Sequence, residues 1–178
     1  MKFSANLGFL WSELPLPKAI HAAKRAGFDA IECHWPYDTP TDEVVAALEA
    51  TGLPMLGLNT RRGNEGENGL SALPGRRDDA FAAVDEALAY ASAINAQNVH
   101  VMAGFATGQT AHSAFLETVS YACTQAAPLG ITILIEPLNS YDAPGYFLQT
   151  TDQAVSIINE VGADNLLLMF DCYHVQLM

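Results

Sequence analysis

A sequence of 178 residues, half of them hydrophobic and 16% charged, excludes a disordered chain and is the length of one globular domain, which we expect over residues 1–178. The formal net charge of −12 argues against a nucleic-acid partner, because phosphates require a basic surface. No apolar run is long enough to span a bilayer, and the three cysteines lack the spacing of a zinc site or a disulfide frame. We therefore expect a soluble, cytoplasmic protein with reduced thiols and no membrane contact.

Strand-like and helix-like segments alternate along the whole chain. The predicted strands cover residues 3–7, 29–32, 54–59, 98–102, 131–135 and 166–170. The predicted helices cover residues 15–26, 41–52, 76–95, 112–127 and 151–161. Each strand is too apolar to be half exposed, so the alternation predicts a parallel sheet covered by helices.

The helices carry recognisable end signals and buried faces. Thr41 is a favourable N-cap residue, and a glycine follows four of the helices, as a left-handed C-cap requires (Gly27, Gly52, Gly130, Gly162). The helical spacing of apolar residues predicts the inward faces (Phe81, Val84, Leu88, Ala91 and Ile94 in the third helix; Phe115, Val119, Ala122 and Ala126 in the fourth). The polar connection over residues 60–75 is too long for a turn, so we interpret it as a functional loop or a lid.

Two architectures share this alternation, an open doubly wound sheet and a closed barrel. No glycine-rich phosphate-binding turn occurs in the chain, which argues against a nucleotide-binding sheet. Polar residues instead follow several strands (Asn6, Glu32, Asn59, Glu136, Asp171), as in a barrel whose site collects side chains from all the strand ends. We therefore predict a (β/α)8 TIM barrel, of which this chain holds about six of the eight βα units, since eight need about 250 residues.

Two acids stand out, because Glu136 and Asp171 each follow an apolar strand. They indicate a shared polar site at one mouth of the sheet. The alternative, that each acid merely caps a turn or the following helix, stays open at this point. Carboxylate oxygens suit Mg2+ or Mn2+, and the acidic net charge is compatible with such a cation.

Four motifs in order carry a resemblance to a known family. They are residues 68–76 (Asn-Gly-Leu-Ser-Ala-Leu-Pro-Gly-Arg), 99–104 (Val-His-Val-Met-Ala-Gly), 135–139 (Ile-Glu-Pro-Leu-Asn) with 144–147 (Pro-Gly-Tyr-Phe), and 170–174 (Phe-Asp-Cys-Tyr-His). The chain resembles the hydroxypyruvate isomerase family, which includes 2-oxo-tetronate isomerases and belongs to the xylose isomerase-like TIM barrels.

The resemblance implies a site for a divalent metal, Mg or Mn, with Glu136 and Asp171 as two of its ligands. It also implies that Glu136 is the catalytic proton-transfer base and that His174 contacts a substrate oxygen. The remaining ligands, and a second catalytic glutamate, would follow strands seven and eight, which this sequence does not contain. Arg61 and Arg62 stand where the family tends toward a different stretch, which leaves the exact substrate open.

Other residues are candidates with two interpretations each. His100 either faces the barrel lumen and contacts substrate or is a hydrogen-bonded core histidine. Glu32 either lines the mouth and contacts substrate or caps the next turn. Arg61, Arg62 and Arg76 either bind a substrate carboxylate or are solvated.

The expected function is isomerisation of a small-molecule 2-hydroxy/2-oxo acid pair, of the hydroxypyruvate/tartronate semialdehyde or 2-oxo-tetronate type. The reaction would proceed by metal-assisted proton transfer through an enediolate. The alternative is a catalytically incomplete barrel fragment that acts as a binding or oligomerising module, because open strand edges favour association into a homo-oligomer.

Overall fold

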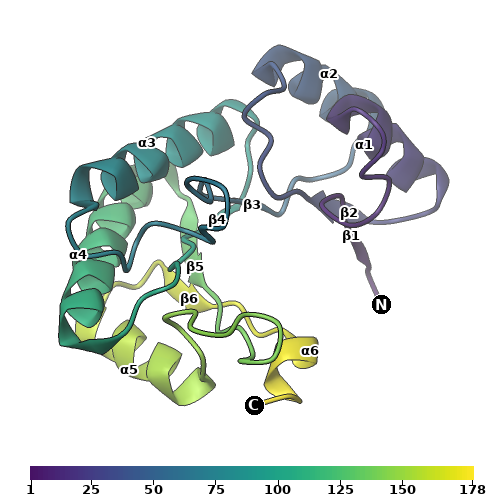
Figure 1. Ribbon diagram of the computed structural model, residues 1–178. Coiled ribbons are helices and arrows are strands. Elements are labelled where there is room, and N and C mark those ends of the chain that lie inside the picture. The colour runs from purple at the N-terminus through teal and green to yellow at the C-terminus, as the bar shows by residue number, and fades with distance from the viewer.

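The computed structural model describes residues 1–178 and has parallel strands alternating with helices (Figure 1). The strands are β1 (Ser4–Asn6), β2 (Ala30–Glu32), β3 (Gly57–Asn59), β4 (Asn98–His100), β5 (Thr132–Ile135) and β6 (Leu166–Leu168). The helices are α1 (Leu16–Arg25), α2 (Thr41–Thr51), α3 (Arg77–Ala93), α4 (Gly108–Ala126), α5 (Thr151–Val161) and the short α6 (Cys172–Val175), with a 3-10 turn at Ala127–Leu129. None of the helices combines the length and the hydropathy that a membrane crossing requires.

The strands pair in parallel and in chain order. β1 pairs with β2, and β3, β4, β5 and β6 form a second run of neighbours. Backbone bonds continue the order between the two runs, since Ile31 N donates to Pro54 O (3.1 Å) and Leu56 N to Ile31 O (2.7 Å). In Figure 1, α3, α4 and α5 lie in a curved row along the outside of the strands, and α1 and α2 lie beside β1 and β2. The predicted TIM-barrel architecture is confirmed, as a partial barrel.

The core lies between the strands and these outer helices. One cluster of 40 buried residues spans every strand and the five long helices. The predicted inward face of α4 is buried as expected, and so is that of α3 except at one position. The prediction for Phe81 is wrong: its ring is only partly buried and stacks on Tyr121 of α4 at 3.9 Å between centroids, with Arg77 over its face.

The helix ends follow the sequence signals with two corrections. Gly52 and Gly162 take the left-handed conformation and are the C-caps of α2 and α5, as predicted. Thr41 is not the N-cap of α2, because the helix begins at Thr41 itself and Pro40 precedes it without a capping side chain. The fourth helix begins at Gly108 rather than at residue 112.

The long connection between β3 and α3 is tied to the C-terminal end of β4. Gly69 forms an antiparallel bridge with Ala103, and Ala72 N donates to Ala103 O (2.8 Å). The hydroxyl of Thr60 accepts a hydrogen bond from Met102 N (3.0 Å). These bonds place the loop at the same end of the strands as the polar residues that follow them.

Candidate active site

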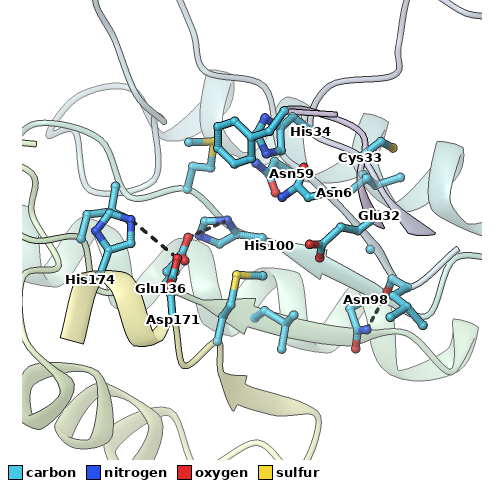
Figure 2. A pocket seen from close by; sticks show the side chains of 18 of the residues that line it. Asn6, Glu32, Cys33, His34, Asn59, Asn98, His100, Glu136, Asp171 and His174 are labelled. Carbon is cyan, nitrogen blue, oxygen red and sulfur yellow. Dashed lines mark hydrogen bonds and ion pairs between the residues drawn. The ribbon is translucent and has the colours of Figure 1, made fainter. Parts of the chain in front are cut away.

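A cavity of about 560 Å³ opens at the C-terminal ends of the strands. Parallel pairing in register brings the residues that end or follow each strand to one edge of the sheet. All five polar residues that the sequence singled out at strand ends line this cavity, as do two predicted substrate contacts, His100 and His174. No lysine or arginine lines it. Figure 2 shows Glu136, Asp171 and His174 at one wall and Glu32 on the opposite side.

Glu136, Asp171 and His174 form a compact cluster whose candidate ligand atoms lie within 4.8 Å of one another. Glu136 directly follows β5, whereas Asp171 and His174 lie at the start and inside of α6. One oxygen of Asp171, Oδ1, accepts from Tyr173 N (2.7 Å) and caps α6, while Oδ2 lies 4.0 Å from Nε2 of His174. The two interpretations of Asp171, helix cap and site residue, are therefore compatible, since they use different oxygens.

Burial raises the pKa values of two carboxyl groups of the cavity, Glu136 and Glu32. Burial, followed by repulsion from Asp171 and Glu32, raises the pKa of Glu136 to about 7. Burial and repulsion from Asp171 also raise the pKa of Glu32, although a hydrogen bond from Asn6 opposes this. Three carboxyl groups face one cavity without a lysine or arginine, so the cavity offers a favourable position to a cation.

His100 lines this cavity and lies between Glu136 and Glu32 in the view of Figure 2. Its side chain is buried, its Nδ1 lies 3.9 Å from Oε2 of Glu136, and its Nε2 has no hydrogen-bond partner. Burial and nearby His34 lower the pKa of His100 to about 4, so the ring is neutral and does not form an ion pair with Glu136. Nε2 is buried without a partner, so the ring is not hydrogen-bonded through that atom as the core-histidine interpretation expects, and the substrate contact of His100 stays a prediction.

His174 is held by a residue that the sequence interpretation did not assign to the site. Its Nδ1 lies 3.2 Å from the backbone N and 2.8 Å from Nδ2 of Asn139. Asn139 is fully buried, and its side chain also reaches Asp142. The signal was present in the sequence, because Asn139 belongs to the motif that contains Glu136, but its partner lies 35 residues further along the chain.

The arginines of the long loop divide into paired and unpaired side chains. Arg61 binds Glu86 through two bonds (2.6 and 3.0 Å), and Arg76 binds Glu67 (2.9 Å) and Asp79. Arg62 has no carboxylate partner and lies over the ring of Trp35, at 4.7 Å from its centroid. Trp35 lines the cavity and is fixed by a bond from its Nε1 to Thr60 O (3.1 Å).

The donor set fits a hard divalent cation. Mg2+ and Mn2+ prefer carboxylate oxygens, and Glu136 and Asp171 present two of them from partly buried positions at one wall. The partial barrel and the acidic residues at the C-terminal ends of its strands are together typical of a TIM-barrel protein whose active site lies at that end.

Comparisons with known proteins agree with that class. A family model described as "Xylose isomerase-like TIM barrel" matches residues 20–178. The 2-oxo-tetronate isomerase of Cupriavidus necator is 40% identical over 183 residues, covering 99% of this chain and 70% of that protein. The hydroxypyruvate isomerase of Escherichia coli is 33% identical over 185 residues, covering all of this chain and 71% of that protein.

A solved structure titled AP endonuclease, family 2, from Brucella melitensis has a TM-score of 0.95 at 35% identity, covering 99% of this chain and 70% of that one. The chain belongs to the xylose isomerase-like TIM barrel family and, within it, to the group of hydroxypyruvate and 2-oxo-tetronate isomerase relatives.

Proposed function

We propose that the protein is an isomerase of small 2-hydroxy/2-oxo acids, of the hydroxypyruvate/tartronate semialdehyde or 2-oxo-tetronate type. The observation that carries the proposal is Glu136, a partly buried carboxyl with a pKa raised to about 7, beside Asp171 at the barrel mouth. A general base works best when its pKa lies near the working pH, because it is then both deprotonated and basic enough. The names of the relatives at 33–40% identity support the same reaction class.

The reaction moves one proton between adjacent carbons. Glu136 removes the proton from the hydroxyl-bearing carbon, the electron pair shifts to the neighbouring carbonyl oxygen, and an enediolate forms. Glu136 then returns the proton to the former carbonyl carbon, and the hydroxyl proton passes to the former carbonyl oxygen, so the net change is isomerisation without an oxidant. An Mg2+ or Mn2+ ion, when held by Glu136 and Asp171, would stabilise the negative charge on the oxygens.

The cavity supplies neutral and acidic groups to orient the substrate. Nε2 of His174 makes no hydrogen bond within the protein, Nδ1 of His100 lies 3.9 Å from Oε2 of Glu136, and Glu32 lines the cavity from β2. The carboxylate of Glu32 can accept a hydrogen bond from a substrate hydroxyl. We assign these three residues as substrate contacts in the proposed reaction.

The substrate's carboxylate needs a positive group that the cavity wall does not provide. Arg62 is the arginine of the long loop whose guanidinium makes no ion pair. It does not line the cavity itself but lies over the ring of Trp35, which does. Burial and, after it, the charge of Arg62 lower the pKa of His34, which lines the cavity. We propose that Arg62 binds the carboxylate of a small anionic substrate. We also propose that the reaction takes place in the cytoplasm.

Deuterium exchange tests the proposal directly. Hydroxypyruvate and 2-oxo-tetronate are incubated with the protein and Mn2+ or Mg2+ in deuterated water, and carbon-bound deuterium and the isomer are followed by NMR. Both should appear with the wild-type protein, and Glu136→Gln should lower the rate by about 10²- to 10⁴-fold. Glu160→Gln is the matched control, because Glu160 pairs with His112 outside the cavity. Metal binding without exchange on either substrate would contradict the proposal and favour a catalytically incomplete barrel.

A further inference from the structure

We infer that Asn139 is a positioning residue that fixes His174 in the tautomer with its proton on Nε2. In this tautomer His174 is a hydrogen-bond donor to a substrate oxygen and not a third metal ligand. The identity of the oxygen rests on the proposed function, whereas the tautomer follows from hydrogen bonds within the protein alone.

The first step is the orientation of the Asn139 amide. Its Oδ1 accepts hydrogen bonds from the backbone N of Tyr141 and of Asp142, both at 3.0 Å. Its Nδ2 lies 2.9 Å from Oδ2 of Asp142. A reversed amide would place an NH2 group against two N–H donors and an oxygen against a carboxylate, so the hydrogen-bond network allows one orientation only.

The second step is the proton of the imidazole. With the amide fixed, Nδ1 of His174 faces two groups that can only donate, Asn139 N at 3.2 Å and Asn139 Nδ2 at 2.8 Å. The two hydrogens of Nδ2 are then fully used, one on Asp142 and one on His174. Nδ1 must offer its lone pair to these donors, so the proton of the neutral ring is on Nε2.

The third step is the direction of the free donor. Nε2 of His174 lies 4.0 Å from Oδ2 of Asp171, too far for a hydrogen bond, and makes no other bond within the protein. A protonated Nε2 has no lone pair for a metal ion, although it lies in the cluster with Glu136 and Asp171. Its N–H therefore suits a carbonyl or hydroxyl oxygen held against the two carboxylates.

Asp142 makes the arrangement rigid. Its Oδ2 accepts from Asn139 Nδ2 (2.9 Å) and from the hydroxyl of Tyr173 (2.6 Å), which is the residue before His174. The loop after β5 and the helix α6 are thus joined by one hydrogen-bond network that ends at the imidazole. Exchanging the donor and acceptor roles of the side chains at 139 and 142 should keep this network and replace one of the two donors that face Nδ1 with an acceptor.

Nitrogen NMR of protein labelled with 15N-histidine tests the inference without reference to activity. His174→Gln assigns the His174 signals among the five histidines, and exposed His21, which makes no hydrogen bond, supplies the internal reference. At pH 8, with and without Mg2+, His174 should show a protonated Nε2 and an unprotonated Nδ1. A protonated Nδ1, a signal averaged between the two tautomers, or loss of the Nε2 proton on adding Mg2+ would each overturn the inference.

The double variant Asn139→Asp/Asp142→Asn tests the role of Asn139. The aspartate at 139 would accept from the ring and from the asparagine at 142, and only the backbone N of residue 139 would still donate toward Nδ1. We therefore expect a population of His174 with its proton on Nδ1 to appear while the fold is kept. The value of kcat/KM should fall about 10- to 100-fold, the range expected when a charge-assisted or buried hydrogen bond to substrate is lost. An unchanged tautomer in a folded double variant would refute the role of Asn139, whatever the activity.

Substitutions at residue 174 separate the effect of a donated hydrogen bond from the effect of side-chain shape. The amide of glutamine can accept from Asn139 and still present an N–H to the cavity, whereas glutamate can only accept when ionised. We expect His174→Gln to keep at least tenfold more activity than His174→Glu. Equal activities would contradict the donor role. If neither substrate is turned over by the wild-type protein, the proposed function fails, and the NMR measurement still decides the tautomer.

Discussion

Nδ1 of His100 lies 3.9 Å from Oε2 of Glu136, yet the two side chains carry no opposite charges at neutral pH. Burial moves their pKa values in opposite directions, that of His100 down to about 4 and that of Glu136 up to about 7. The same loss of water therefore keeps the histidine neutral and holds the carboxyl near its point of titration. A salt bridge here would have lowered the pKa of Glu136 and weakened it as a base.

The first prediction concerns stability against pH in the presence of a chelator. The pKa of Glu136 is higher in the folded state, about 7 against 4.5, so its contribution is present below pH 4.5 and is lost as the pH rises through 7. The pKa of His100 is lower in the folded state, about 4 against 6.5, so its contribution is present above pH 6.5 and is lost as the pH falls toward 4. Each contribution is on the order of 3 kcal/mol.

Two variants separate these opposing contributions in urea unfolding. Glu136→Gln should be more stable than the wild type at pH 8 and lose that advantage below pH 4.5, the ordinary pKa of glutamate. His100→Leu should lose less stability than the wild type between pH 6.5 and pH 4, because it has no ring to protonate on unfolding. Parallel stability curves for the wild type and Glu136→Gln would show that burial does not raise the pKa of Glu136.

The second prediction concerns the unpaired nitrogen of His100. Because Nε2 has no partner, His100→Leu should leave the unfolding free energy at pH 8 within about 1 kcal/mol of the wild type or raise it. The KM for the acid substrate should rise about tenfold as a substrate contact is lost. Asn98→Leu is the matched control on the same strand, because Nδ2 of Asn98 donates to Leu56 O at 2.6 Å and the loss of this bond should cost about 1–2 kcal/mol. A large loss of stability with unchanged KM in His100→Leu would indicate a purely structural histidine.

The third prediction compares two neighbouring arginines. Arg62→Gln should raise KM for an anionic substrate about 3- to 10-fold and weaken the dependence of kcat/KM on salt, because a charge at the rim mainly steers the ligand. Arg61→Gln should change neither, since Arg61 already binds Glu86 and lies over Tyr37. Circular dichroism and thermal unfolding would verify that both variants fold. Equal effects of the two substitutions would remove Arg62 from the substrate site.

Most of the fold could be predicted because each element has its own local signal. Helix α5 was predicted at the residues where it lies, since its glycine C-cap and polar N-terminal end are encoded within the segment itself. Short α6 was missed, because a helix of four residues has no hydrophobic periodicity and depends on the Asp171 cap. Phe81 was misassigned because helical periodicity identifies the residues on one face of a helix but not the residues that they contact. The ring of Phe81 stacks on the ring of Tyr121 near the surface instead of packing in the core.

The location of the candidate site could be predicted from the sequence, but the hydrogen bonds and ion pairs between its side chains could not. The strand-end rule identified Glu136, Asp171 and Glu32, because the parallel sheet brings all strand ends to one edge. The hydrogen bonds of Asn139 could not be inferred, because they join a loop after β5 to α6 and depend on side-chain geometry. The sequence could not show that Arg61 has an ion-pair partner and Arg62 has none, since nothing in the sequence distinguishes two neighbouring arginines of one loop.

The last prediction concerns the attachment of the long loop at the cavity. A Cβ on Gly69 would lie 2.3 Å from Met102 O, and the φ of Gly69 is +116°, so Gly69→Ala meets a backbone clash in addition to an unfavourable conformation. Gly66→Ala is the matched control, because Gly66 also has a positive φ, +85°, but nothing within 4 Å of its Cβ. We expect a loss of about 1 kcal/mol for Gly66→Ala and at least twice that for Gly69→Ala, measured by urea unfolding. Since Gly69 N also bonds Arg62 O (2.8 Å), Gly69→Ala should raise KM as Arg62→Gln does. Equal stability losses in the two alanine variants would show that the loop can move off the strand without cost.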